Sequence, residues 1–133
     1  MIDVRDLVQS TLDTALAADG VYTYWLRKTE TTGEDADEYI VFTQGNDTNT
    51  SFADDSALIK TAGITVKYYY RDTYLDTYDG RTHVKDREEV IRTSLLGAGF
   101  FCINGPFDAG DVDDIGFGTT IFEIEYGRLA EAV

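Results

Sequence analysis

The sequence predicts an α+β fold in which two helices pack on one face of a mainly antiparallel sheet, in the order α-β-β-β-α-β-β. Two segments repeat apolar residues at helical spacing, four alternate apolar and polar residues with the period of a strand, and a fifth strand is a short apolar run. Nine Tyr and seven Phe against one Trp also favour a sheet over a helical bundle. We expect residues 1–133 to form a single domain, because this length is enough for one buried core.

The N-terminal third predicts a helix followed by two strands. Val4 to Ala18 carries apolar residues at helical spacing; Asp3 is a good N-cap, and Gly20 suits a left-handed helix end. Strands are expected at Val21–Thr29 and Glu38–Gln44. The acidic connection between them is short, so we expect an antiparallel hairpin.

The stretch Gly63–Arg71 predicts the central strand, because its β-branched and aromatic residues alternate over two well-patterned faces. We expect one face to lie beneath the helices, and its residues are Ile64, Val66, Tyr68 and Tyr70. The opposite face carries Thr65, Lys67, Tyr69 and Arg71. Because Tyr and Arg are enriched at interfaces, we expect this second face to contact protein, with burial of both faces as the alternative.

Residues 45–62 are polar, and we expect a long excursion from the sheet with a short helical turn near Asp55 to Lys60. Phe52 is one of its few large apolar residues. Long loops in compact domains commonly bind partners, so Phe52 joins the predicted interface.

The C-terminal half predicts a second helix and two strands. Asp72–Arg81 is expected to extend the central strand to a turn at Asp79–Gly80, with a helix from Thr82 or His83 to about Gly97. Glu88 and Arg92 stand four residues apart in the order that favours an ion pair. The last segments are expected to be a strand, an acidic glycine-rich loop, a strand and a fraying tail, at Phe100–Asn104, Phe107–Gly118, Thr119–Gly127 and Arg128–Val133.

The charge balance argues against a protein that binds nucleic acid through its phosphates. The net charge is −14 and the isoelectric point is near 4.2. Binding of nucleic acid through its phosphates needs clustered Lys and Arg, so we do not expect it. The charge suits solubility and repulsion between copies, or else a surface past which DNA slides or which meets a basic partner.

The sequence also indicates in which compartment the protein is expected to reside. The first residues do not resemble a signal peptide, and no apolar run reaches the roughly 18 residues of a membrane helix, so no membrane association is expected. The lone Cys102 cannot form an internal disulfide, which suits a reducing compartment and a buried thiol.

Catalytic, cofactor and metal sites are not expected from the residue patterns, and we do not expect an enzyme. His83 is interpreted as a cap or surface residue, because no nucleophile motif accompanies it. The acidic loop, with Asp108, Asp111, Asp113 and Asp114, offers oxygen ligands for hard cations, but its spacing does not match the twelve-residue Ca²⁺ loop. We interpret it, and the second cluster of Glu34, Asp35, Asp37 and Glu38, as solvated loops.

The order of these segments resembles a known family. The residues that carry the resemblance are Tyr39-Ile40-Val41-Phe42, the strand Ile64 to Tyr70, the helix end Leu96 to Phe100, and Phe122-Glu123-Ile124-Glu125-Tyr126. With the N-terminal helix, the polar excursion and the acidic loop, they resemble the tail completion, or tail-to-head joining, proteins of long-tailed, siphovirus-type bacteriophages, which are relatives of the tail terminators. The resemblance covers nearly the full chain.

The resemblance implies a structural role without catalytic residues or cofactors. Such proteins form a ring, usually of six copies, that caps the head-proximal end of the tail tube and docks to the head connector. DNA passes through the channel without specific binding. The protein would then reside in the virion at the head–tail interface, and in the host cytoplasm during assembly. The alternative is a small acidic protein-binding module, such as an inhibitor or a DNA mimic, with no phage role.

Overall fold

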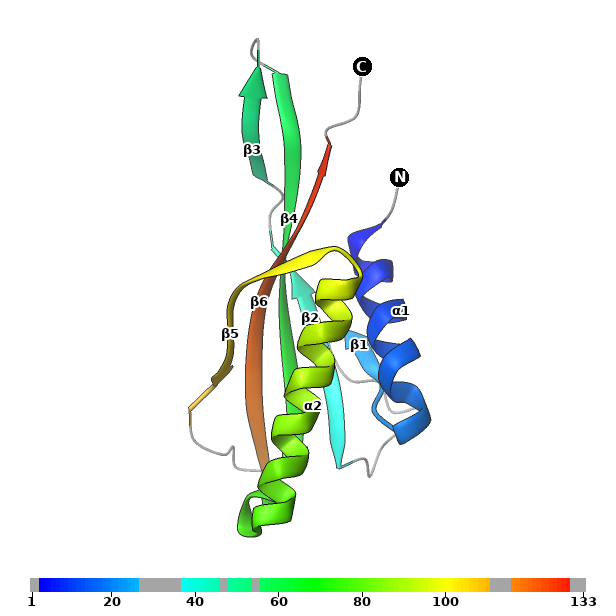
Figure 1. The fold of residues 1–133 in the computed structure, drawn as a ribbon, viewed down its shortest axis with the longest axis vertical. Coiled ribbons are helices and arrows are strands. Elements are labelled where there is room, and N and C mark those ends of the chain that lie inside the picture. Colours follow the sequence, from blue (N-terminus) through cyan, green and yellow to red (C-terminus); the bar gives the residue numbers. More distant parts are fainter. Residues whose placement is uncertain (1–2, 27–36, 46–47, 54–55, 111–115, 130–133) are drawn as a thin grey trace.

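The computed structural model describes residues 3–26, 37–45, 48–53, 56–110 and 116–129. They form a six-stranded sheet with two long helices on one face, which confirms the predicted α+β class (Figure 1). The elements in chain order are α1 (Val4–Leu16), the 3₁₀ helix η1 (Ala17–Asp19), β1 (Thr23–Trp25), β2 (Glu38–Gln44), β3 (Thr48–Ala53), β4 (Ser56–Arg71), the 3₁₀ helix η2 (Asp72–Asp76), α2 (Tyr78–Gly97), β5 (Phe100–Asp108) and β6 (Phe117–Leu129).

The sheet is organised around β4. Its order is β1-β2-β4-β6-β5, and β3 pairs with the first part of β4. The ladder between β4 and β6 is antiparallel and runs from Ile59↔Leu129 to Arg71↔Phe117. A strand of 16 residues can hold three neighbours, because β2 and β3 share one of its sides.

The core lies between the sheet and the helices. The β4 residues predicted to face the helices are all buried, with Val66 and Tyr68 at 0% exposure. The α1 residues Val4, Val8, Leu12 and Leu16 belong to the same cluster. The helix ends agree with the sequence: Asp3 Oδ1 accepts the Arg5 N–H at 3.0 Å, and Gly20 is left-handed with φ 81°.

The predicted hairpin between the first two strands is wrong. β1 has three residues and pairs with β2 in parallel, with Thr23 opposite Ile40. Leu26, whose φ is 71°, turns the chain out of the strand. Alternation of side chains does not reveal strand direction, and the residues between Trp25 and Glu38 are enough for the connection that parallel strands need. Residues 27–36, including Glu34 and Asp35, lie outside the described part.

Residues 45–62 extend the sheet rather than leave it. β3 and the start of β4 form an antiparallel hairpin, which adds a sixth strand to the predicted order. The helical turn expected near Asp55 to Lys60 is wrong, because Ser56 to Lys60 belong to β4 and pair with β3. This hairpin and the end of β6 project beyond the two helices (Figure 1).

The C-terminal boundaries also differ from the prediction. Arg128 lies in β6 opposite Lys60, so the expectation of a fraying tail from residue 128 is wrong at residues 128–129, and residues 130–133 are outside the described part. β5 passes Asn104 and continues to Asp108, with two shifts of register around the Gly105–Pro106 segment. Pairing with β6 therefore extends a strand that the sequence predicted to end at Asn104.

The second helix begins earlier than expected. β4 ends at Arg71, η2 follows, and α2 starts at Tyr78. Thr77 is the N-cap, and its hydroxyl accepts the Gly80 N–H at 3.0 Å. The Asp79–Gly80 pair, predicted to be a turn before the helix, is therefore its first turn. A capping Thr and a close contact with η2 outweigh the usual preference of Asp-Gly for turns.

Candidate functional site

The face of the sheet opposite the helices is the candidate functional site, and we call it the open face. Among the described elements, both long helices lie on the other face (Figure 1). Strand register brings residues of β2, β4, β5 and β6 together here. The open-face residues that the argument uses are Tyr39, Val41, Thr65, Lys67, Tyr69, Arg71, Phe107, Phe117, Ile121, Glu123 and Glu125.

An aromatic cluster occupies one end of the open face. The Tyr39 and Tyr69 rings stack with centroids 4.8 Å apart, and Phe117 meets Tyr39 edge-on at 5.4 Å. The Arg71 guanidinium lies 4.5 Å from the centre of the Phe117 ring and forms an ion pair with Asp37 at 3.6 Å. Two stacked tyrosine rings, with an adjoining phenylalanine ring that carries a guanidinium, form a preorganised surface of the kind enriched at protein interfaces.

Charges of both signs lie close together on the open face. Lys67 and Arg71 lie on β4, and Glu123 and Glu125 pair with Thr65 and Gly63 of the same strand, so Glu123 is a diagonal neighbour of Lys67. The row of Val41, Lys67, Ile121 and Phe107 is otherwise apolar. This distribution suits contact with a protein surface, because apolar area supplies affinity and charges fix orientation.

The sequence located part of this face. Thr65, Lys67, Tyr69 and Arg71 are brought together on one side of β4 and are all half-buried. Phe52 lies in β3 opposite Ala57, and its side chain is outside the described part. The residues contributed by the neighbouring strands were missed. Phe117 had a signal, since it shares the alternation of Thr119 and Ile121, but the prediction began the last strand two residues later.

The predicted acidic group is only partly described. Asp108 ends β5 opposite Thr120 and is exposed. Asp111, Asp113 and Asp114 lie outside the described residues. Within the described ranges, no three His, Cys, Asp or Glu side chains are grouped so that they could hold a metal ion.

A buried polar cluster joins α2 to the sheet on the opposite side. The side chain of Glu38 is 8% exposed; it accepts the Tyr68 hydroxyl and the Arg87 Nε–H, the latter at 3.1 Å. His83 Nε2 lies 2.9 Å from the same Glu38 oxygen, and its ring stacks on Tyr74 at 4.8 Å. Burial and the bond to Glu38 raise the pKa of Tyr68 far above its ordinary value.

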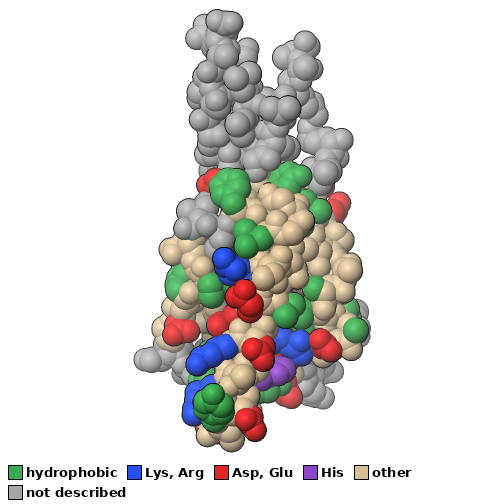
Figure 2. Space-filling model, in the orientation of Figure 1, with side chains coloured by type: hydrophobic (Ala, Val, Ile, Leu, Met, Phe, Trp, Pro, Cys, Tyr) green, Lys and Arg blue, Asp and Glu red, His purple; other side chains and the backbone are tan. Residues whose placement is uncertain are grey.

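This cluster corrects the interpretation of His83 as a cap. His83 lies within α2 and contacts Glu38 of β2, 45 residues away. A hollow of about 290 Å³ opens beside it, lined by Asp19, His83, Asp86, Arg87 and Val90. Arg87 bonds both Glu38 of β2 and Asp19 of η1, so the arrangement ties α2 and η1 to the sheet. Charged side chains of both signs gather over α2 on this face (Figure 2).

A second carboxyl group is held under α2. Thr120 donates its hydroxyl to Glu88 Oε2 at 2.5 Å. Burial, and to a smaller degree the nearby Asp108, raise the pKa of Glu88. The ion pair expected between Glu88 and Arg92 is therefore replaced: Glu88 turns to the sheet, and Arg92 lies 3.4 Å from Glu89.

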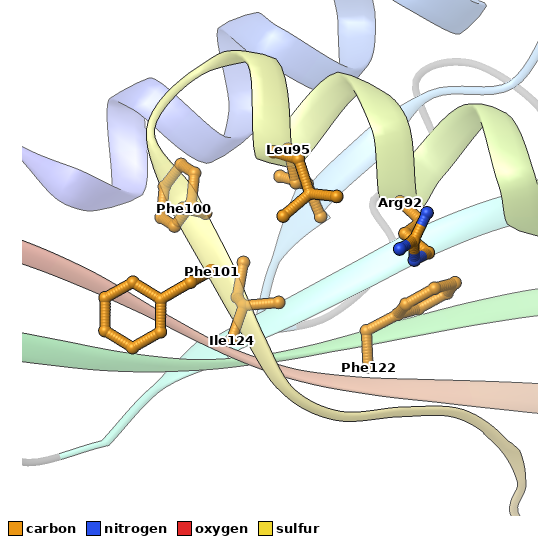
Figure 3. A pocket seen from close by; sticks show the side chains of 7 residues that line it. Arg92, Leu95, Phe100, Phe101, Phe122 and Ile124 are labelled. Atoms are coloured by element: carbon orange, nitrogen blue, oxygen red, sulfur yellow. The ribbon is translucent and has the colours of Figure 1, made fainter.

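A small apolar contact joins the end of α2 to β5 and β6. Leu95 and Phe100 lie above Phe122 and Ile124, and Arg92 lies over Phe122 (Figure 3). The space between these side chains has no room for a water molecule, so it is packing rather than a ligand pocket. Leu96 and Phe101, at 40% and 46% exposure, border it on the surface.

No family model matches the chain. No curated protein matches it either. Among solved structures, the chain is similar to the gp17 protein of bacteriophage SPP1, with 14% identity and a TM-score of 0.42, over 96% of this chain and 88% of that one. These values are too low to establish a family. Of the helices in the described part of the chain, none is long and apolar enough to span a membrane.

Proposed function

We propose that the protein is a structural virion protein of a long-tailed bacteriophage. It caps the head-proximal end of the tail tube and joins the tail to the head connector as a ring of copies, six in the assembled particle, around the DNA channel. The order of sequence segments over nearly the whole chain supports this role. The observation that carries it is the open face, where stacked aromatic rings and charges of both signs lie together and no helix of the described residues covers them.

The open face would serve as the docking surface in this role. Tyr39 and Tyr69 offer a rigid aromatic patch held in place by the buried Phe117, and rigid side chains lose little entropy on binding. Lys67 and Arg71 supply the positive charge of this patch on a chain whose net charge is −14. The partner surface would then be a copy, the tube or the connector that presents carboxylates opposite Lys67 and Arg71.

The role can be tested by electron microscopy of the purified protein mixed with isolated tails and DNA-filled heads. We expect rings at the head-proximal ends of the tails. Lys67→Glu should abolish this binding, because it reverses a positive charge of the open face, and circular dichroism checks that the variant is still folded. Lys85→Glu is the matched control, since it makes the same charge change at an exposed position of α2. Indifference of the wild-type protein to tails would contradict the proposal.

The acidic loop gives a separate prediction about DNA passage. If Asp111, Asp113 and Asp114 line the channel, repulsion from DNA phosphates keeps DNA from sticking. Replacing all three with Lys should then slow DNA ejection from assembled particles, measured by release of DNA after receptor addition. Unchanged ejection and infectivity would place these residues away from the channel.

The competing function is an acidic protein-binding module of the inhibitor or DNA-mimic type, and the charge of −14 is the observation that favours it. Such a module would bind a basic protein in solution and ignore tails. The experiment with tails separates the two functions directly.

A further inference from the structure

The open face carries balanced charges, although the chain as a whole is strongly acidic. Lys67 and Arg71 offset Glu123 and Glu125, whereas the net charge of the chain is −14. Arg71 forms an ion pair with Asp37 at 3.6 Å. Lys67 has no ion pair or hydrogen bond with any described residue, even though Glu123 is its diagonal neighbour. A lysine and a glutamate that lie close without pairing with each other can both contact a second protein surface.

Strand register arranges the open face in rows that cross four strands. The sheet order places β4 and β6 side by side, with β2 and β5 flanking them. From β2 to β5, two adjacent rows are Val41-Lys67-Ile121-Phe107 and Thr43-Thr65-Glu123-Asn104. The first row is apolar apart from its lysine, and the second row is polar throughout.

These rows are complementary to themselves under a two-fold axis. An axis that runs parallel to the strands, above the boundary between β4 and β6, lays β4 of one copy on β6 of another and β2 on β5. Val41 then lies on Phe107 and Lys67 lies on Ile121, so the lysine stem covers apolar surface. Glu123 follows Ile121 on the same face of β6, within reach of the Lys67 ammonium. Sheets that pack face to face keep their strands within about 30° of each other, so the rows stay matched near the axis.

We propose that the open faces of two copies pack on each other about this axis, so that the free protein is a two-fold symmetric dimer. Lys67 of each copy faces Glu123 of the other, and the contact therefore occurs twice. The apolar row supplies affinity, and the two ion pairs fix the register. On the function proposed above, on which this last step rests, the dimer covers the docking surface until a copy reaches the tail.

Charge reversal on each side of the contact tests the dimer in sedimentation experiments. Lys67→Glu and Glu123→Lys each place like charges opposite one another twice, so each should raise the dissociation constant of the dimer by about tenfold or more. A mixture of the two variants should associate as the wild type does, because opposite charges face each other again at both contacts. Recovery between two different chains cannot come from pairing within one copy.

Glu123→Lys also separates this contact from the effect of net charge. The substitution makes the chain less acidic, so weaker general repulsion alone would strengthen association, whereas the proposed contact requires that association weaken. Lys85→Glu and Glu89→Lys make the same charge changes at exposed positions of α2 and are the matched controls. Both should weaken association far less than the open-face variants. Circular dichroism checks that every variant is folded.

The outcomes distinguish the dimer from the function proposed above. A wild-type protein that remains monomeric at the highest concentration reached, yet binds tails, would overturn the dimer and leave the function standing. A dimer with recovery in the mixture, in a protein that ignores tails, would support the dimer and contradict the function. Open-face variants that associate as tightly as the α2 controls, or a mixture that does not recover, would overturn the dimer.

Discussion

Polar side chains under α2 add to the apolar core by fixing where this helix lies on the sheet. Glu38 is buried, and an unpaired buried carboxylate would be costly. Tyr68, His83 and Arg87 surround one of its oxygens, and Arg87 also bonds Asp19 at 2.9 Å. The cluster therefore fixes the position of α2 on the sheet.

Tyr68→Phe tests this cluster. The variant keeps the buried ring and removes the hydroxyl that Glu38 accepts, so we expect a loss of about 1.5–3 kcal/mol in the free energy of unfolding, as for a hydrogen bond to a charged group. Tyr78→Phe removes a hydroxyl from a side chain that is 75% exposed and should leave stability unchanged. Urea unfolding monitored by circular dichroism measures both, and equal stabilities of the two variants would contradict the role of the cluster.

Glu88 should make the stability of the protein depend on pH. Burial raises its pKa above the ordinary 4.5, with Asp108 adding to this and Thr120 and Lys85 opposing it. The protonated form therefore favours folding; this contribution is complete below pH 4.5 and is lost as the pH rises through the raised pKa. Glu88→Gln keeps an acceptor for Thr120 without the charge, so its stability relative to the wild type should increase from pH 4 to pH 7.

Thermal unfolding at several pH values, with Glu89→Gln as the control, measures this difference. Glu89 is exposed next to Glu88 in the chain, so Glu89→Gln removes the same charge without altering a group held under α2. A constant difference between Glu88→Gln and the wild type would contradict the prediction.

At the scale of elements, the sequence predicted where strands lie and which of their residues are buried better than it predicted which strands pair and in which direction. The alternation in Gly63–Arg71 identified which β4 residues are buried, because the period of two fixes the two faces of a strand. It did not reveal that β1 runs parallel to β2, since alternation is the same in either direction. The start of β4 was missed because Ser56 to Lys60 are strand residues through their pairing with β3 and β6, not through their own propensity.

The junction between η2 and α2 gives a prediction at this scale. A Cβ placed on Gly80 would lie 2.1 Å from the Tyr74 carbonyl oxygen, so the two helices approach too closely there for any side chain. Gly80→Ala should lower the free energy of unfolding by about 1–3 kcal/mol, as for overpacking. Gly97→Ala, where a Cβ meets nothing within 4 Å, should be neutral or stabilising by up to about 1 kcal/mol. Thermal melts of both variants test it, and a stable Gly80→Ala would contradict the close approach.

At the scale of the molecule, the open face was only half predictable. The sequence supplied the β4 residues Lys67, Tyr69 and Arg71, because one strand carries them all. Tyr39 and Phe117 join them only through the register of β2 and β6 with β4, and register depends on long-range pairing. The same limit applies to β3, which is a strand because it pairs with β4 and not because of its polar sequence.

The whole-molecule charge predicts how assembly responds to salt. Repulsion between copies of net charge −14 is screened as ionic strength rises, since the Debye length falls from about 10 Å at 0.1 M to about 3 Å at 1 M. Association between copies should therefore strengthen with NaCl in sedimentation experiments. The variant Asp6→Asn/Asp86→Asn/Glu89→Gln removes three charges from exposed helix positions and should associate at lower salt than the wild type. Association that weakens with salt would mean that ion pairs between copies outweigh this repulsion.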